Sequence, residues 1–355
     1  MSAADAGSAT RKTVTGGILL VNKPAGVTSF LVVSKARQLY GLRRVGHCGT
    51  LDPFATGLLP IVIGRATRAV AYMDNYDKTY VVRIRFGSET DTMDPTGTIT
   101  RERELTDTEL SELEAADYAP IRAAISSLTE LTEQLPPLYS AVKVDGQPLY
   151  KYARAGKTVE RRSRPMKVFR ADTLGIVRDE TGLYADAHIH CAKGTYIRAL
   201  AETAGRTTGL LAHAETLRRV QTGPFTLAEA HSWNELTDAL AAKLPLPLLP
   251  VEQAFAGYPC LNLTAEQARR LVQGQVIDLP ADQATGGNID SVPPVCRFAD
   301  PAGAADDRAK AAKPCIVTVF GPSGFTGLGR LSINEGGQLQ LAAERIFADL
   351  ENLDE

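Results

Sequence analysis

The sequence predicts an α+β protein of two domains, the second a small β-barrel-like module. The residues 78–87, KTYVVRIRFG, alternate between two faces, as does an antiparallel strand that is buried on one side. Residues 29–40 repeat apolar side chains at helical spacing. The proline-rich segment 243–255, KLPLPLLPVEQAF, is typical of a hinge, and short strands follow it.

Composition is that of a cytoplasmic globular protein. The chain has 355 residues, 44% of them hydrophobic, which is enough for one large and one smaller core. Its first residues are small and polar, so residues 1–14 are expected to form a disordered tail, and no apolar run is long enough to span a membrane. The five cysteines lack any C-x-x-C pair and are expected to remain free in a reducing compartment.

The first elements follow in order. Residues 16–23 are expected to form a strand that ends at a turn through Lys23 and Pro24. Thr28 or Ser29 then caps a helix that ends at Gly41. Its buried stripe is expected to contain Val32, Val33, Ala36, Leu39 and Tyr40.

The next elements alternate between strand and helix. Residues 58–64 predict a short strand, and 65–73 predict a short helix. In the strand 78–87, one face is expected to hold Tyr80, Val82, Ile84 and Phe86. Residues 106–134 predict two helices. Residues 183–191 predict a strand, after which helical spacing begins near Gly194.

We expect the first domain to span residues 15–250 and the second 251–355. The second domain should contain a helix at 264–275 and strands at 315–321 and 327–333, with a glycine-rich turn region at 321–329. Residues 281–312 have few apolar side chains and predict a flexible insertion.

The net charge of −2 gives no sign of a nucleic-acid partner, but residues 151–170 concentrate basic side chains. A run of this kind, taken alone, is more typical of a solvated surface than of a binding site.

The sequence gives little support for a phosphate-binding loop, a zinc site or a serine-hydrolase active site. A phosphate-binding loop around 155–158 would need a glycine at the position of Lys151. His188 and His190 are at strand spacing but have no third ligand at a recognisable offset, so ordinary strand histidines are favoured over zinc ligands. The chain contains no G-x-S-x-G nucleophile elbow.

The loop 44–57, RVGHCGTLDPFATG, is the strongest candidate for a catalytic site. Asp52 precedes a proline and is flanked by glycines, so its carboxylate can project from the loop. An Asp-Pro turn that only bonds its own backbone is the alternative. If Arg198 lies nearby, its guanidinium would favour the ionised carboxylate that a nucleophile requires.

Six stretches carry a resemblance to a known family, and they occur in the family's order: GILLVNKPAGVTS, VGHCGTLDPFATGLLPIVIGRATR, DKTYVVRIRFGSETDTMDPTG, QLPPLYSAVKVDGQPLYKYARAG, HCAKGTYIRALAETAG and LRRVQTGPF. The chain resembles the TruB-type tRNA pseudouridine synthases over residues 16–255. Beyond them it is more weakly similar to the family's C-terminal PUA-like RNA-binding module.

The resemblance implies the pseudouridine synthase fold, with a large mixed, mainly antiparallel sheet flanked by helices. It implies isomerisation of uridine at position 55 in the T-loop of tRNA, without a metal or cofactor. The expected partner is the T-arm of tRNA, and the expected form is a bacterial-type monomer with no obligatory protein partner.

The resemblance also assigns roles to individual residues. The catalytic residues are Asp52, Tyr80 and Arg198, with the arginine pairing with the aspartate and the tyrosine stacking on the flipped uracil. The RNA-binding residues are Lys23, Pro24, His47, Gly49, Thr50, Tyr196 and Leu217. Cys48 stands where the family usually has a threonine, which affects only local packing.

The sequence leaves open both the chemical role of Asp52 and two rival functions. Asp52 could attack C1′ of the sugar, remove the C2′ proton or add to C6 of the base. A tRNA-folding protein without catalysis and a guide-RNA-dependent pseudouridine synthase are the rival functions.

Overall fold

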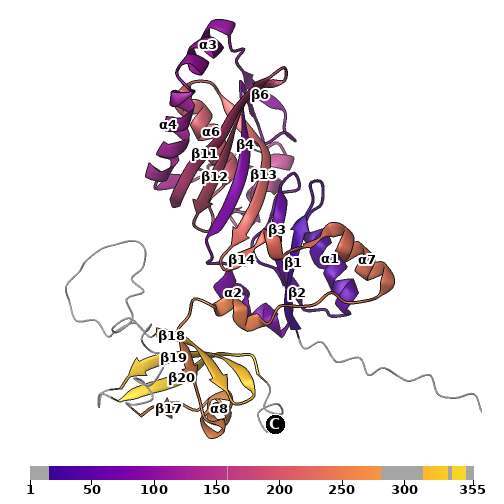
Figure 1. Ribbon diagram of the computed structural model, residues 1–355, viewed down its shortest axis with the longest axis vertical. Coiled ribbons are helices and arrows are strands. Elements are labelled where there is room, and N and C mark those ends of the chain that lie inside the picture. Colours follow the sequence, from indigo (N-terminus) through magenta and orange to yellow (C-terminus); the bar gives the residue numbers. More distant parts are fainter. Residues whose placement is uncertain (1–15, 158, 281–314, 335–337, 349–355) are drawn as a thin grey trace, which may run out of the picture. The chain divides into compact units, whose positions relative to one another are not determined.

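A computed structural model describes residues 16–157, 159–280, 315–334 and 338–348 (Figure 1). The chain divides into two compact units between Leu248 and Leu249. The expected tail at 1–14 and the expected insertion at 281–312 lie outside the described residues. The functional roles assigned to the two domains remain predictions.

The first unit contains fifteen of the strands. They are β1 (Gly16–Lys23), β2 (Val45–His47), β3 (Thr56–Gly64), β4 (Lys78–Phe86), β5 (Ser88–Thr90), β6 (Ile99–Glu102), β7 (Glu133–Gln134), β8 (Lys143–Val144), β9 (Gln147–Pro148), β10 (Arg164–Pro165), β11 (Val168–Asp179), β12 (Gly182–Cys191), β13 (Ala212–Thr222), β14 (Phe225–Thr226) and β15 (His231–Ser232).

The helices of this unit lie between the strands. They are α1 (Ser29–Tyr40), α2 (Val70–Met73), α3 (Asp107–Ala115), α4 (Ala119–Ser126), α5 (Leu149–Arg154), α6 (Ile197–Thr208) and α7 (Trp233–Ala242), with 3-10 turns at Arg65–Ala69, Ser127–Glu130 and Leu227–Glu229. The helix predicted at 65–73 and the two helices predicted within 106–134 are confirmed.

A nine-stranded sheet forms the framework of the unit. Its main path runs β11-β12-β4-β13-β3-β1-β15, with β14 beside β13 and β2 beside β3. Only the β13–β3 and β1–β15 pairs are parallel, so the expected mixed, mainly antiparallel sheet is confirmed. The helices α4 and α6 pack near β11 and β13, and α1 and α7 pack near β1 (Figure 1).

Local sequence signals explain the elements around the site. On β4, Tyr80 and the other predicted members of its face are buried, while Val81, Arg83 and Arg85 on the other face are partly exposed. Thr28 caps α1, because its hydroxyl accepts a hydrogen bond from the amide of Leu31 at 3.1 Å. Gly41 ends this helix in the left-handed conformation, with φ 65°.

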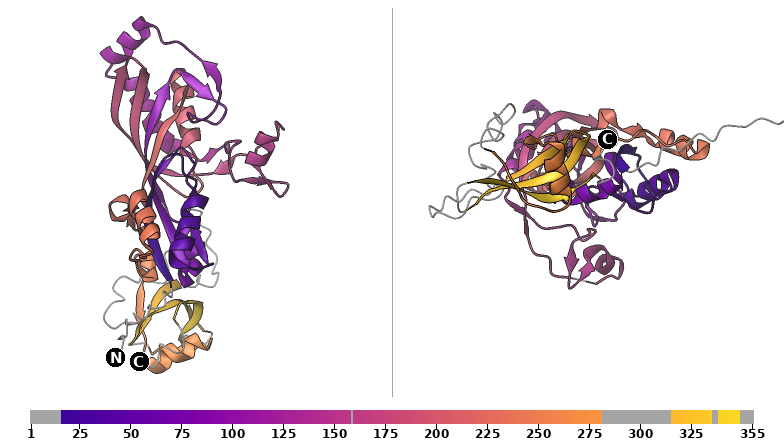
Figure 2. Two further views of the ribbon diagram at one scale, coloured as in Figure 1. Left: turned by 90° about the vertical axis from the view of Figure 1, so that its right-hand side faces the viewer. Right: turned by 90° about the horizontal axis from the view of Figure 1, so that it is seen from below.

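The second unit is a curled five-stranded sheet (Figure 2). Its elements are β16 (Cys260–Asn262), α8 (Ala265–Val272), β17 (Ile277–Asp278), β18 (Cys315–Gly321), β19 (Gly324–Ile333) and β20 (Leu339–Ile346), preceded by a 3-10 turn at Val251–Phe255. The helix predicted at 264–275 and the strand at 315–321 are confirmed.

The glycine-rich turn predicted at 321–329 is mostly wrong. Gly321 pairs with Gly324, so only Pro322 and Ser323 form the turn, and β19 begins three residues before the predicted strand. The phenyl rings of Phe320 and Phe325 lie 5.5 Å apart, which favours this two-residue hairpin.

Within the first unit, an excursion of residues 135–163 connects β7 to β10. These two short strands pair with each other, Gln134 opposite Arg164. The segment between them carries α5 and projects from the sheet (Figure 2).

Candidate active site

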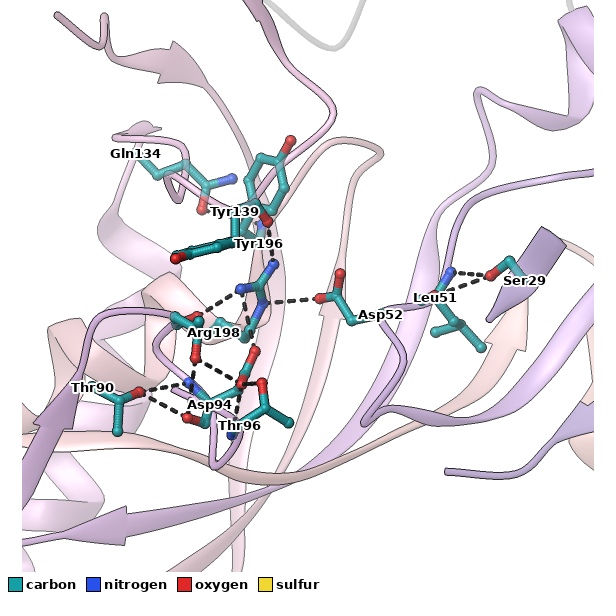
Figure 3. Close-up of polar contacts among 11 residues, drawn as sticks. Ser29, Leu51, Asp52, Thr90, Asp94, Thr96, Gln134, Tyr139, Tyr196 and Arg198 are labelled. Carbon is teal, nitrogen blue, oxygen red and sulfur yellow. Dashed lines mark hydrogen bonds and ion pairs between the residues drawn. The ribbon is translucent and has the colours of Figure 1, made fainter. Parts of the chain in front are cut away.

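The loop that carries Asp52 connects β2 to β3, and side chains from two other elements hold it. The hydroxyl of Ser29, at the start of α1, donates to the carbonyl of Leu51 at 3.0 Å and accepts from the Leu51 amide at 2.9 Å (Figure 3). The ammonium of Lys23, at the end of β1, donates to the carbonyls of Val27 and Pro53. Asp52 therefore projects from a fixed loop and not from a mobile linker.

Arg198, in the first turn of α6, contacts the loop between β2 and β3, which we call the catalytic loop after its proposed role. Its Nε lies 2.9 Å from Oδ2 of Asp52, and its side chain is only 3% exposed (Figure 3). The Nε–H is not aligned with this oxygen, so the contact is an ion pair without a well-formed hydrogen bond. The guanidinium also donates to the carbonyls of Thr92 at 2.6 Å and Tyr139 at 2.9 Å.

Asp94 is a second carboxylate partner of Arg198, and the sequence analysis missed it. Its Oδ2 accepts from Nη1 of Arg198 at 3.3 Å. Its Oδ1 accepts from the hydroxyl of Thr92 at 2.8 Å and from the amide of Thr96 at 3.0 Å. The available signal was a second Asp-Pro pair surrounded by threonines, in one of the stretches that carry the family resemblance.

A cleft of about 590 Å³ lies beside Asp52. Seven of the ten predicted site residues line it, namely Gly49, Thr50, Asp52, Tyr80, Tyr196, Arg198 and Leu217. The predicted residues from β4, α6, β13 and the β2–β3 loop therefore lie around one cleft, although they are far apart in the sequence.

Lys23, Pro24 and His47 do not line this cleft. Lys23 is fully buried, and its ammonium donates to backbone carbonyls, so it supports the loop, while its role in RNA binding remains a prediction. Burial lowers the pKa of Lys23 to about 8. Burial, followed by the charge of Arg219, lowers the pKa of His47.

The pKa of Asp52 is raised, whereas the sequence analysis expected the guanidinium of Arg198 to favour the ionised carboxylate. Burial raises the pKa of its carboxyl, and the negative charge of Asp94 adds to this effect. Arg198 and Lys23 favour the ionised form but do not outweigh burial. A carboxyl whose pKa is raised keeps its proton to a higher pH than a free aspartate, and it must lose that proton before it can act as a nucleophile or base.

Gln134 links the excursion to the site, and it too was missed. Its side-chain amide donates to the carbonyl of Gly194 at 3.0 Å, and its Oε1 accepts from the amide of Tyr196 at 3.2 Å (Figure 3). These two bonds hold the turn before α6. Tyr196 is the N-cap of this helix, and Arg198 lies in its first turn. Gln134 opens one of the stretches that carry the family resemblance, but the resemblance assigned it no role.

Cys48 and the two strand histidines lie outside the cleft beside Asp52. Cys48 is buried, with its thiol 3.5 Å from the sulfur of Met73. His188 and His190 lie near Asp172 and Asp77, and across the described ranges no group of three or more metal-ligating side chains converges. None of the helices that the structure describes has the length and apolar character needed to cross a bilayer.

The family model for the TruB family pseudouridylate synthase N-terminal domain matches residues 37–197. The tRNA pseudouridine synthase B of Chromohalobacter salexigens is 41% identical over 265 residues, 75% of this chain and 82% of the relative. The protein of the same name from Aromatoleum aromaticum is 40% identical, over 77% of this chain and 85% of the relative.

Solved structures show a similar fold. A Cbf5-Nop10-Gar1 complex matches with TM-score 0.61 and 21% identity, over 96% of this chain and 88% of that chain. The archaeal box H/ACA sRNP Nop10-Cbf5 complex matches with TM-score 0.59 and 19% identity, over 97% and 89%. The identity of 40–41% to relatives that are covered over 82–85% of their length shows that the chain belongs to the TruB family of pseudouridylate synthases and is an enzyme of that class.

Proposed function

We propose that this enzyme converts uridine to pseudouridine at position 55 in the T-loop of tRNA. The observation that carries the proposal is the Asp52–Arg198 ion pair on the wall of a cleft that Tyr80, Tyr196 and Leu217 also line. The names of the relatives, tRNA pseudouridine synthase B, support tRNA as the substrate class.

The reaction exchanges one bond to the sugar for another. The N1–C1′ bond breaks, the base turns, and a C5–C1′ bond forms. The proton on C5 leaves, and N1 gains a proton, so the base is neither oxidised nor reduced. Asp52 acts at the reacting uridine, as a nucleophile at C1′, as a base toward the C2′ proton or by addition to C6.

The cleft residues have complementary roles. Because the uridine is stacked in its loop, it must first be flipped out, which costs a few kcal/mol of unstacking. The ring of Tyr80 stacks on the flipped uracil, and its hydroxyl assists proton transfer. Tyr196 and Leu217 enclose the base, and Arg198 orients the carboxylate of Asp52.

The excursion between β7 and β10 provides an RNA-binding surface. The basic run 151–170 begins in it and continues through β10, and Lys151, Arg154, Arg162 and Arg164 of this run are exposed. Phosphate contacts and aromatic stacking can offset the cost of opening the loop. His47, Gly49, Thr50 and Pro24 hold the opened loop near Asp52, and the second unit, as a PUA-like module, adds further contacts.

We extend the proposal to the state of the enzyme. It acts in the cytoplasm as a monomer, on its own, without a protein partner, a metal or a cofactor. Activity of the purified chain on an isolated T-arm hairpin tests this, because a guide-RNA-dependent enzyme would be inactive without its guide and partner proteins.

The decisive experiment is tritium release from a T-arm hairpin that carries C5-labelled uridine. The wild type should release tritium, and Asp52→Ala should release none while still binding the hairpin. A hairpin with label only at other uridines serves as the control for position 55. Binding by the wild type without any release would favour the tRNA-folding function and refute the proposal.

A further inference from the structure

The side chain of Arg219, on β13, is buried in the wall of the cleft. It is 1% exposed, although a buried guanidinium is costly unless its charge is compensated. Within the described ranges no carboxylate lies at ion-pair distance from it. The catalytic scheme above does not use this cation, so its presence needs a reason.

The hydrogen bonds of Arg219 reach both ends of the catalytic loop. Its Nη2 donates to the carbonyl of Gly49 at 2.9 Å, and its Nε donates to the carbonyl of Leu58 at 2.8 Å. Asp52 lies between these two points in the sequence. The planar guanidinium of Arg219 therefore fixes the distance between Gly49 and Leu58. The ammonium of a lysine has no pair of donors at a fixed spacing and could not fix this distance.

Two glycines make room for this arrangement. Gly49 has φ 81°, and a Cβ there would lie 3.2 Å from Nη1 of Arg219. Gly57 has φ 101°, and a Cβ there would lie only 2.2 Å from the Arg219 carbonyl oxygen. The glycines of the loop thus serve a close approach to Arg219 as well as a turn.

Arg219 also lies opposite Tyr80. The two residues are cross-strand partners in the β13–β4 pair, and both line the cleft. Burial raises the pKa of the Tyr80 phenol, and the positive charge of Arg219 opposes that rise. A single cation is therefore shared between the loop of Asp52 and the hydroxyl of Tyr80.

We propose that Arg219 is a positioning residue for the reaction: its guanidinium fixes the Gly49–Leu58 segment, and with it Asp52, and keeps a positive charge beside Tyr80. This inference rests on the proposed function. It goes beyond that function because Arg219 acts through Asp52 and Tyr80 and need not touch the uridine.

The test compares Arg219→Lys and Arg219→Gln with wild type in single-turnover pseudouridine formation on the T-arm hairpin. Lysine keeps the charge but not the two-pronged geometry, and glutamine loses the charge as well. We expect the rate constant to fall about 10-fold for lysine and about 100-fold for glutamine, with hairpin affinity unchanged. The surface variant Arg122→Gln, on α4, is the matched control and should react at the wild-type rate.

The rate constant separates positioning from a purely structural role. Partial unfolding lowers the amplitude of a single-turnover reaction and the melting temperature, but the folded fraction still reacts at the wild-type rate. A wild-type rate constant in folded Arg219→Lys overturns the proposal, as does an equal rate for the two variants. If Arg219→Gln does not fold, the lysine variant alone decides.

The same assay distinguishes the two proposals. A wild-type enzyme that forms no pseudouridine in the hairpin refutes the proposed function, and the inference falls with it. Turnover by wild type together with unimpaired Arg219 variants refutes the inference alone.

Discussion

Asp94 and Asp52 contact different nitrogens of the Arg198 guanidinium. Oδ2 of Asp94 lies 3.3 Å from Nη1, and Oδ2 of Asp52 lies 2.9 Å from Nε. Arg198 is thus shared by two carboxylates, of which one is 6% and the other 35% exposed. The more exposed carboxylate is the one available to a substrate.

Replacing Asp94 should impair catalysis without impairing binding. In Asp94→Asn the side chain still accepts hydrogen bonds, but the charge that holds Arg198 is lost. We expect single-turnover pseudouridine formation to slow about 10- to 100-fold, with hairpin affinity unchanged. Asp91→Asn, in the same β5–β6 loop but exposed, is the control. Equal rates for the two variants would remove Asp94 from the site.

Asp52→Asn should abolish turnover, because the amide keeps the shape of the side chain but has neither its charge nor its nucleophilicity. The rate should fall about 10³-fold or more. Filter binding of the hairpin should give the wild-type affinity. Detectable turnover near the wild-type rate would show that another group performs the chemistry.

Arg198→Lys tests the guanidinium itself. An ammonium cannot reach Asp52, Asp94 and the carbonyls of Thr92 and Tyr139 together, so we expect a loss of about 10²-fold in rate. Rate and melting temperature should both be measured, since the variant also loses buried hydrogen bonds. A wild-type rate in the folded variant would contradict the role given to Arg198.

Tyr80→Phe keeps the aromatic face and removes the hydroxyl. We expect hairpin affinity close to wild type and a rate about 10²-fold lower, because stacking survives and proton transfer does not. Affinity and rate are measured on the same hairpin. Weakened binding with an unchanged rate would assign Tyr80 to recognition alone.

The pH dependence follows from the raised pKa of Asp52. A protonated carboxyl is inactive as a nucleophile or base, so the rate should fall with decreasing pH at a point above the ordinary value of 3.8. Asp94 contributes to the rise, so Asp94→Asn should move this acid limb to lower pH. Single-turnover rates between about pH 4 and 8 test the shift, and an unmoved or raised limb would contradict it.

Much of the fold could be predicted because its signals are local. The alternation on β4 and the cap and stop of α1 depend on residues a few positions apart. The β18–β19 turn was misplaced because glycine favours turns yet also fits a strand where Phe320 and Phe325 pack across the hairpin.

The site was predictable only in part, for a similar reason. The residues that line the cleft matched family motifs, but which of them meet depends on sheet order. Lys23 stands beside the catalytic loop, and only the fold shows that its ammonium turns inward to carbonyls. Asp94 and Gln134 both lie in stretches that carry the family resemblance, but their roles depend on Arg198, Gly194 and Tyr196, which are distant in the sequence and meet them only in the fold.

The pairing of β7 with β10 has a consequence for how such enzymes diversify. Since Gln134 and Arg164 lie opposite each other, the basic excursion starts and finishes at neighbouring points of the molecule. Its length and composition can change during evolution without displacing any strand of the nine-stranded sheet. Changes close to Tyr139 would differ in effect, because the carbonyl of this residue accepts a hydrogen bond from Arg198.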